Sequence, residues 1–308
     1  MKENLNLKQS QELGERILNN LEKVIFGKRS VLELVVIGLF SDGHILIEDI
    51  PGVGKTMLAR SLAISTGCKF SRIQFTPDLL PSDITGVSIY DQKKNIFEFR
   101  PGPVFTQILL ADEINRATPK AQSALLEAMG ESQVSVDNVT RELPHPFFVI
   151  ATQNPMEYEG VFPLPESQMD RFLLHTALGY PSMAIENSIL ERMQVNHPIE
   201  TLTAIASPEE ILKAQSDVRN IFVSSGVRKY LLEIVNATRN NPDLLVGASP
   251  RASLGLIRAS QASAVLQGRN FITPDDIKQH AKAVLSHRFI LNPEARMSNI
   301  SREVVMGE

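Results

Sequence analysis

The spacing of apolar positions changes a little past the middle of the chain. In the first part, short apolar runs alternate with helix-like or turn-rich stretches, which is typical of a parallel sheet covered on both faces. The runs that predict strands are residues 44–48, 69–75, 107–112, 147–152 and 172–177. Beyond about residue 180, strand patterns vanish and helix starts recur. The sequence therefore predicts an α/β domain over residues 1–180 and a smaller all-α domain over residues 181–308.

Two segments interrupt the alternation of the first domain. Residues 87–99 carry Asp-Gln-Lys-Lys-Asn between two strand-like arms, and residues 133–143 carry a central Asp-Asn. Turn-forming residues between such arms favour β-hairpins. We expect both hairpins to project from the sheet.

Helix starts mark the second domain. Ser207, Ser249 and Thr273 each precede a proline, so a hydroxyl can cap the helix while proline occupies its first turn. Glu210 completes a capping box with Ser207. The tail, residues 292–308, is expected to be loosely held.

The stretch HILIEDIPGVGKT, residues 44–56, predicts a phosphate-binding loop between a strand and a helix. In the pattern G-x-x-x-x-G-K-[ST], backbone N–H groups wrap the phosphates, the lysine reaches the outer phosphates and the hydroxyl binds magnesium. Lys55 and Thr56 keep the end of the pattern, whereas Asp49 stands where glycine is expected. Aspartate adopts unusual backbone angles less freely than glycine. The alternative is a plain strand–turn–helix connection with a surface lysine.

Two further predicted strands end in polar side chains. The stretch QILLADE, residues 107–113, ends in Asp112 and Glu113. A carboxylate beside a phosphate loop can hold magnesium, and the next acid can polarise a water. The strand over residues 147–152 leads to Asn154, whose amide could orient that water. The alternatives are a strand that runs into a polar loop and a turn-forming asparagine before proline.

Two arginines are candidates for phosphate contact. Arg171 follows Asp170 just before the fifth predicted strand, and Arg251 lies in the first turn of a predicted helix. A guanidinium group can bind two phosphate oxygens at once, and helix starts attract anions. A surface salt bridge is the open alternative for each.

Composition narrows the partners and the compartment. The net charge of −4 argues weakly against a dedicated nucleic-acid binder. The single cysteine, Cys68, excludes a disulfide framework within the chain and fits a reducing cytoplasm. The N-terminus lacks the apolar core of a secretory signal, and the longest apolar run, near residues 31–40, is too short to span a bilayer.

Taken together, these motifs resemble the MoxR family of AAA+ ATPases, close to the magnesium-chelatase motor subunits and the minichromosome-maintenance helicases. The matching stretches are EDIPGVGKT (48–56), FRPGPVF (99–105), LLADEINRA (109–117), LLEAMGESQV (125–134), FFVIATQNPMEYEGVFPLPESQMDRF (147–172) and GASPRA (247–252). They run in the family's order and extend from about residue 20 to about residue 290. The resemblance implies a P-loop NTPase core with a five-stranded parallel sheet and β-hairpin inserts, followed by a helical lid.

The resemblance also implies roles for the residues that match its motifs. The nucleotide-binding residues would be Gly52, Val53, Gly54, Lys55, Thr56 and Met57 in the loop, with Val24 and Ile25 on the adenine side. Lys28 departs from the family, where glutamine is more usual. Thr56 and Asp112 would bind magnesium, and Glu113 would be the catalytic acid.

Three further roles concern the sensors and the arginine finger. Asn154 looks like the first sensor and Arg251 like the second sensor on the lid. Arg171 looks like an arginine finger that reaches the ATP of a neighbouring subunit.

The resemblance implies a Mg-ATP-dependent, chaperone-like motor that forms a homo-oligomeric ring, usually of six subunits. Its client would be a partner protein complex, often one with a von Willebrand factor A domain protein or a metal-cofactor enzyme. Two other functions stay open: a nucleotide-switched binding scaffold with slow hydrolysis, and a nucleic-acid motor, which the hairpins fit but the charge balance does not. We expect ATP and Mg²⁺ as cofactors, no nucleic-acid partner, no transmembrane segment and a cytoplasmic location.

Overall fold

A five-stranded parallel sheet forms the centre of the first domain in the computed structural model, which describes residues 2–155, 160–193 and 198–307. The strands lie in the order β2-β5-β8-β1-β9. Their bounds are β1 (Ile45–Glu48), β2 (Phe70–Gln74), β5 (Ile108–Asp112), β8 (Phe148–Gln153) and β9 (Leu174–Thr176). All five predicted strands are confirmed, and every pair in this sheet is parallel.

Helices cover both faces of the sheet, because successive side chains of a strand point to opposite sides. Ile45 and Ile47 join the apolar cluster of one face, and Leu46 joins the cluster of the other. The first face packs against α1 (Lys2–Leu21), α2 (Arg29–Phe40) and α3 (Lys55–Thr66). The second face packs against α4 (Pro81–Thr85) and α5 (Pro119–Glu131).

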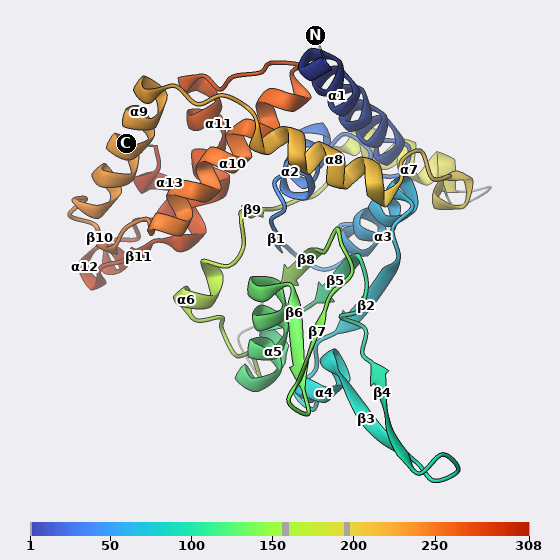
Figure 1. Cartoon of the computed structure of the whole chain (residues 1–308). Coiled ribbons are helices and arrows are strands. Elements are labelled where there is room, and N and C mark those ends of the chain that lie inside the picture. The colour runs from blue at the N-terminus through green and yellow to red at the C-terminus, as the bar shows by residue number, and fades with distance from the viewer. Residues whose placement is uncertain (1, 156–159, 194–197, 308) are drawn as a thin grey trace.

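Both predicted hairpins are present. They are formed by β3 (Gly86–Asp91) with β4 (Ile96–Pro101), and by β6 (Gln133–Val136) with β7 (Val139–Glu142). Asp137 and Asn138 have φ of 53° and 60°, as a two-residue hairpin turn requires. Figure 1 shows the β3–β4 hairpin projecting far from the rest of the molecule.

The second domain is a helical lid. Its main helices are α7 (Met183–Met193), α8 (Pro208–Arg219), α9 (Ser225–Arg239), α10 (Pro250–Leu266) and α11 (Pro274–Leu285). Ser207, Ser249 and Thr273 cap α8, α10 and α11 as predicted, each accepting a backbone N–H three residues on. The lid also contains a short antiparallel pair, β10 (Leu244–Val246) with β11 (Ile290–Leu291), which the sequence pattern did not suggest.

The expectation of a loosely held tail is wrong for the residues that the structure describes. Asn292 and Ser301 cap two short helices of the tail, and Val305 is buried. The remaining elements are α6 (Glu166–Met169), α12 (Pro293–Met297), α13 (Arg302–Val305) and the 3-10 helices η1 (Ile114–Arg116), η2 (Pro198–Thr201) and η3 (Ser286–Arg288).

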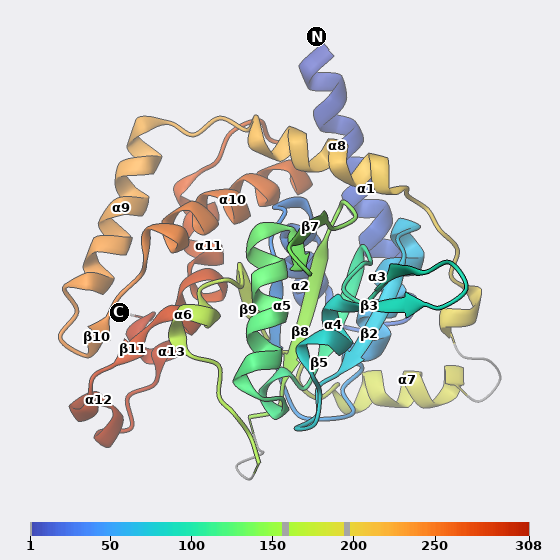
Figure 2. The same cartoon turned by 60° about the horizontal axis from the view of Figure 1, so that its bottom comes forward.

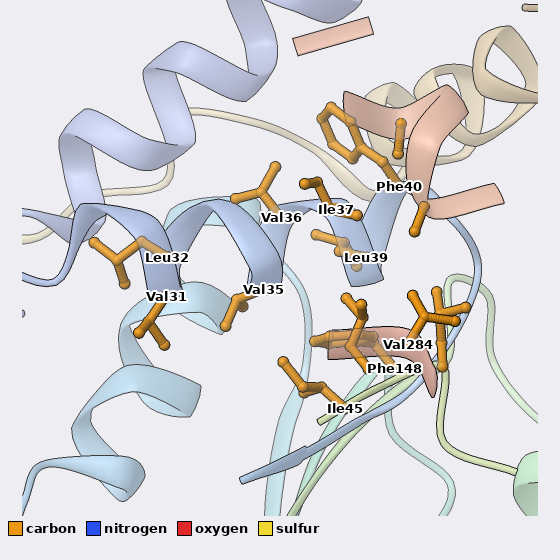
Figure 3. Packing of buried hydrophobic residues seen from close by; sticks show 14 of the residues in the cluster. Val31, Leu32, Val35, Val36, Ile37, Leu39, Phe40, Ile45, Phe148 and Val284 are labelled. Atoms are coloured by element: carbon orange, nitrogen blue, oxygen red, sulfur yellow. The ribbon is translucent and has the colours of Figure 1, made fainter. Parts of the chain in front are cut away.

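One apolar core joins the lid to the sheet. Figure 3 shows Val284 of α11 beside Phe148 of β8 and the apolar side chains of α2. Figure 2 shows α9, α10 and α11 together toward the β9 end of the sheet, with α3 and the β3–β4 hairpin toward the β2 end. The domain boundary near residue 180 stays a prediction. No helix among the described residues is both long and apolar enough to cross a membrane.

Candidate active site

The loop after β1 has the backbone that phosphate binding requires. Gly52 and Gly54 have φ of 85° and 96°, a region that side-chain-bearing residues rarely adopt. Gly54 caps α3, so the loop leads directly into the N-terminus of a 12-residue helix. A Cβ atom built on Gly52 would meet no heavy atom within 4 Å, so open space lies beside the loop. The loop thus offers N–H groups, a helix N-terminus and room for a phosphate chain.

Asp49 replaces the first glycine of the pattern without backbone strain, because it is not among the residues of positive φ. Its buried carboxylate accepts hydrogen bonds from the backbone N–H of Ile50 at 2.9 Å and of Gly179 at 2.6 Å. Its carbonyl accepts a 2.6 Å hydrogen bond from Nζ of Lys55. Asp49 therefore orients the predicted phosphate-binding lysine and fastens the loop to the segment that leads into the lid.

Asp112 and Glu113 lie at the carboxyl end of β5, held by the neighbouring strand β8. The fully buried Thr152 donates from Oγ1 to Oδ1 of Asp112 at 2.6 Å and accepts the backbone N–H of Glu113 at 2.9 Å. Glu113 has φ of 57°, a region that residues with a side chain adopt uncommonly and that can mark a functional site. One hydroxyl therefore fixes both acids at the same edge of the sheet as the phosphate loop.

Three polar residues that the sequence did not single out contact this pair of acids. Arg72 donates to Oδ2 of Asp112 at 2.7 Å, while Gln74 and Arg116 donate to Oε2 of Glu113 at 2.7 Å and 3.1 Å. Arg72 and Gln74 lie on β2, where Gln74 is the register partner of Asp112. The order of strands in the sheet reveals the contacts of Arg72 and Gln74, whereas Arg116 lies three residues after Glu113 in the sequence.

The other predicted nucleotide residues lie close to the loop. Asn154 directly follows β8 and is buried, and its carbonyl accepts a hydrogen bond from Asn115. Cδ1 of Ile25 is 3.9 Å from the position of a Cβ on Gly54, so the predicted adenine-side residue touches the loop. Val24 packs beside it against the same core. Lys28, the departure from the family pattern, donates to the carbonyl of Tyr180 at 2.9 Å.

Arg171 and Arg251 lie at a separate place, where the sheet meets the lid. Nη1 of Arg171 donates to the carbonyl of Leu126 in α5. Arg251 is exposed in the first turn of α10. The two arginines are linked through Asp170, whose carboxylate accepts the hydroxyl of Ser249 at 2.9 Å. Because α5 and α3 cover opposite faces of the sheet, Arg171 lies across the sheet from the helix that begins at Lys55.

The donor atoms at the sheet edge fit a magnesium–nucleotide complex. Thr56 supplies a hydroxyl and Asp112 a carboxylate, which are hard oxygen ligands. Oδ2 of Asp112 accepts two N–H groups of Arg72, whereas Oδ1 accepts only the hydroxyl of Thr152 and keeps a second lone pair for a metal-bound water. Magnesium is commonly held by one or two protein oxygens together with water and substrate phosphates. The described residues contain no group of three His, Cys, Asp or Glu that could hold a metal on its own.

Comparisons with known proteins agree with this geometry. Residues 44–174 match the family described as ATPase family associated with various cellular activities (AAA), and residues 236–306 match the AAA lid domain. The uncharacterised protein YeaC of Bacillus subtilis is 50% identical over 96% of this chain and 92% of its own length. Chaperone MoxR1 of Mycobacterium tuberculosis is 44% identical over 95% of this chain and 80% of its own length. The chain belongs to the MoxR family of AAA+ ATPases.

Solved structures support the same assignment. A candidate ATPase from Cytophaga hutchinsonii superposes on this MoxR-family protein with a TM-score of 0.91 and 38% identity, covering 98% of this chain and 94% of the other. A full-length MCM homologue from Methanopyrus kandleri has a TM-score of 0.62 and 18% identity, covering 93% of this chain and 62% of the other, so it shows the fold alone. The protein is therefore a chaperone-like AAA+ ATPase that binds nucleotide and hydrolyses ATP.

Proposed function

We propose that this protein is a Mg-ATP-dependent remodelling motor that works as a homo-oligomeric ring, most simply a hexamer. The observation that carries the proposal is the division of the predicted catalytic residues between two places. Lys55, Asp112 and Glu113 gather at the carboxyl edge of the sheet, whereas Arg171 and Arg251 lie at the junction with the lid. An arginine across the sheet from its own phosphate loop is suited to the nucleotide of a neighbouring subunit. A contact between unlike surfaces that closes on itself makes a ring.

In the proposed reaction, each residue has a part that its position favours. Backbone N–H groups from Gly52 to Thr56 bind the phosphates, and Lys55 leaves the carbonyl of Asp49 to reach the outer ones. Magnesium, when bound by Thr56 and Asp112, would neutralise the charge that develops on the phosphates. Glu113 accepts a proton from the attacking water while Asn154 orients that water. Arg171 of the neighbouring subunit stabilises the transition state.

The proposed client-binding element is the β3–β4 hairpin. Side chains exposed on it include Val87, Ile89, Tyr90, Ile96 and Phe97, and Phe97 is 72% exposed. Contiguous exposed apolar surface commonly marks a protein–protein contact. We propose a client protein complex as the partner, with a von Willebrand factor A domain protein as the first candidate. The free thiol of Cys68 fits the cytoplasm as the site of this activity.

The test is ATP turnover per subunit across a wide range of protein concentration, for the wild type, Arg171→Ala and Glu113→Gln. We expect turnover to rise with concentration, and both variants to bind ATP while turning it over at least about 100-fold more slowly. Turnover that is independent of concentration and of Arg171 would contradict the shared site. A Glu113→Gln variant that still activates a client fully would favour the nucleotide-switched scaffold over the motor.

A further inference from the structure

The segment that carries Arg171 is fastened to the lid on both sides of that residue. Asp170 precedes Arg171 and forms an ion pair with Arg288 of η3, with Oδ1 at 3.2 Å from Nη1. Phe172 follows Arg171, and its carbonyl accepts a 2.6 Å hydrogen bond from Nη2 of the same Arg288. Nε2 of His287 lies 3.1 Å from the same carbonyl and 3.3 Å from Nε of Arg288. The guanidinium group of Arg288 therefore contacts the residue before Arg171 and the residue after it.

Arg288 can hold this segment because its buried guanidinium group contacts the residues on both sides of Arg171. Its side chain is only 3% exposed, in an interior where a charged group without partners would be very unfavourable. Burial lowers its pKa to about 10, the charge of Asp170 acts in the opposite direction, and the charge of Arg251 lowers it again.

The same junction includes the start of the helix that carries Arg251. Ser249 caps α10 by accepting the N–H of Ala252 at 3.1 Å, and its hydroxyl donates to Asp170. Gly255, one turn later, faces the strand that follows Arg171, and a Cβ atom there would lie 3.0 Å from Cδ1 of Leu173. The helix therefore packs closely against the chain just after Arg171, and the two elements cannot shift independently without breaking these contacts.

We propose that Arg288 is a positioning residue of the lid that sets the reach of Arg171 into the neighbouring active site. A movement of the lid then moves Arg171, so the state of one subunit's lid controls hydrolysis in the next subunit. The inference rests on the shared site of the proposed function. A fork of five donors can hold an oxygen on either side of Arg171, and a lysine, with one compact charge, cannot do so in the same geometry.

Mixed oligomers test the proposal. A Glu113→Gln subunit can donate Arg171 but cannot hydrolyse its own ATP, and an Arg171→Ala subunit can hydrolyse ATP but cannot donate. We expect their mixture to recover turnover that neither has alone. Adding Arg288→Lys to the Glu113→Gln subunit should lower the recovered turnover at least about tenfold, since small misplacements of a catalytic group have large effects. Adding it to the Arg171→Ala subunit should change the recovered turnover less than about twofold.

A matched control and a second variant separate positioning from folding. The control is Arg269→Lys, at another lid arginine, which pairs with the buried Asp276 at 2.6 Å and also bonds the carbonyl of Phe271. It should give the same recovered turnover whether it is added to the Glu113→Gln subunit or to the Arg171→Ala subunit. Asp170→Asn keeps an oxygen for Ser249 but loses the ion pair with Arg288. Like Arg288→Lys, it should lower the recovered turnover only when it is added to the Glu113→Gln subunit.

Each outcome decides the matter. If Arg288→Lys lowers the recovered turnover equally in either subunit, or in neither, the proposal is wrong and the shared site still holds. Absence of recovery in the unmodified mixture would overturn the shared site and this inference with it. If Arg288→Lys and Asp170→Asn both fail to bind ATP as single variants, the contacts serve the fold and the proposal is wrong.

Discussion

Charged side chains are held in place differently at the sheet edge, where Asp112 and Glu113 lie, and at the lid junction, where Arg171 lies. At the sheet edge, Asp112 and Glu113 are bound by strands β2 and β8, which are parts of one continuous sheet. At the lid junction, Arg171 itself bonds Leu126 of α5, and the preceding residue, Asp170, is held by Ser249 and Arg288, which lie more than 75 residues away in the sequence. The first set of contacts lies within one sheet, whereas the second joins the first domain to the lid.

The largest expected difference between the two places concerns nucleotide affinity. Lys55→Ala should abolish measurable ATP binding and lower turnover by about 10³-fold or more, because it removes a charged donor aimed at the phosphates. Arg171→Ala should leave the ATP Kd within about threefold and lower kcat alone. Titration with a fluorescent ATP analogue measures the Kd of both variants and steady-state ATP hydrolysis measures their kcat, with the exposed Lys120→Ala on α5 as the control. An equal loss of ATP affinity in Lys55→Ala and Arg171→Ala would contradict the distinction between a binding residue at the sheet edge and a residue at the lid junction that acts on turnover alone.

Acid should weaken the lid more than the sheet edge. His280 of α11 is buried with no hydrogen-bond partner at either ring nitrogen, and burial lowers its pKa from 6.5 to about 4. The unfolded chain therefore binds a proton below pH 6.5 that the folded chain takes up only near pH 4. Stability is full above pH 6.5 and is lost as pH falls toward 4, by about 2 kcal/mol at pH 5.

Urea unfolding of wild type and His280→Leu at pH 7 and pH 5 measures this contribution. We expect the difference in unfolding free energy between the two pH values to shrink by about 2 kcal/mol in the variant. Residual pH dependence is expected from His287, whose pKa burial also lowers. An unchanged pH dependence in His280→Leu would contradict the assignment.

The hydroxyl of Thr152 is the next test of the sheet edge. Thr152→Val keeps the shape but leaves Oδ1 of Asp112 without its donor and the N–H of Glu113 without an acceptor. We expect about tenfold lower kcat and a loss of about 1–3 kcal/mol in unfolding free energy. Thr152→Ser restores the hydroxyl and should recover most of both quantities. Equal turnover in the valine and serine variants would mean that the hydroxyl does not position the acids.

The difference between the two places also explains what the sequence could predict. Lys55, Asp112 and Asn154 each follow a short apolar run, and the carboxyl ends of parallel strands meet at one edge, so local pattern was sufficient to place them together. Arg72 and Gln74 could not be predicted, because their contact with the acids depends on which strand lies next to β5. The contacts of Arg288 with the residues on either side of Arg171 could not be predicted either, because Arg288 lies in the lid, far away in the sequence.

The smallest expected effect comes from Gln74. Its amide donates to Oε2 of Glu113 at 2.7 Å, and Arg116 donates to the same oxygen at 3.1 Å, so removal of one donor leaves the other. Gln74→Leu should therefore lower kcat by no more than about fivefold, the equivalent of about 1 kcal/mol for one hydrogen bond. Steady-state turnover at saturating ATP measures it, with Gln74→Glu adding a repelling charge in the same position. Faster turnover in Gln74→Leu would instead mean that Gln74 holds Glu113 away from the attacking water, and that the sheet edge also contains a contact that must break before hydrolysis.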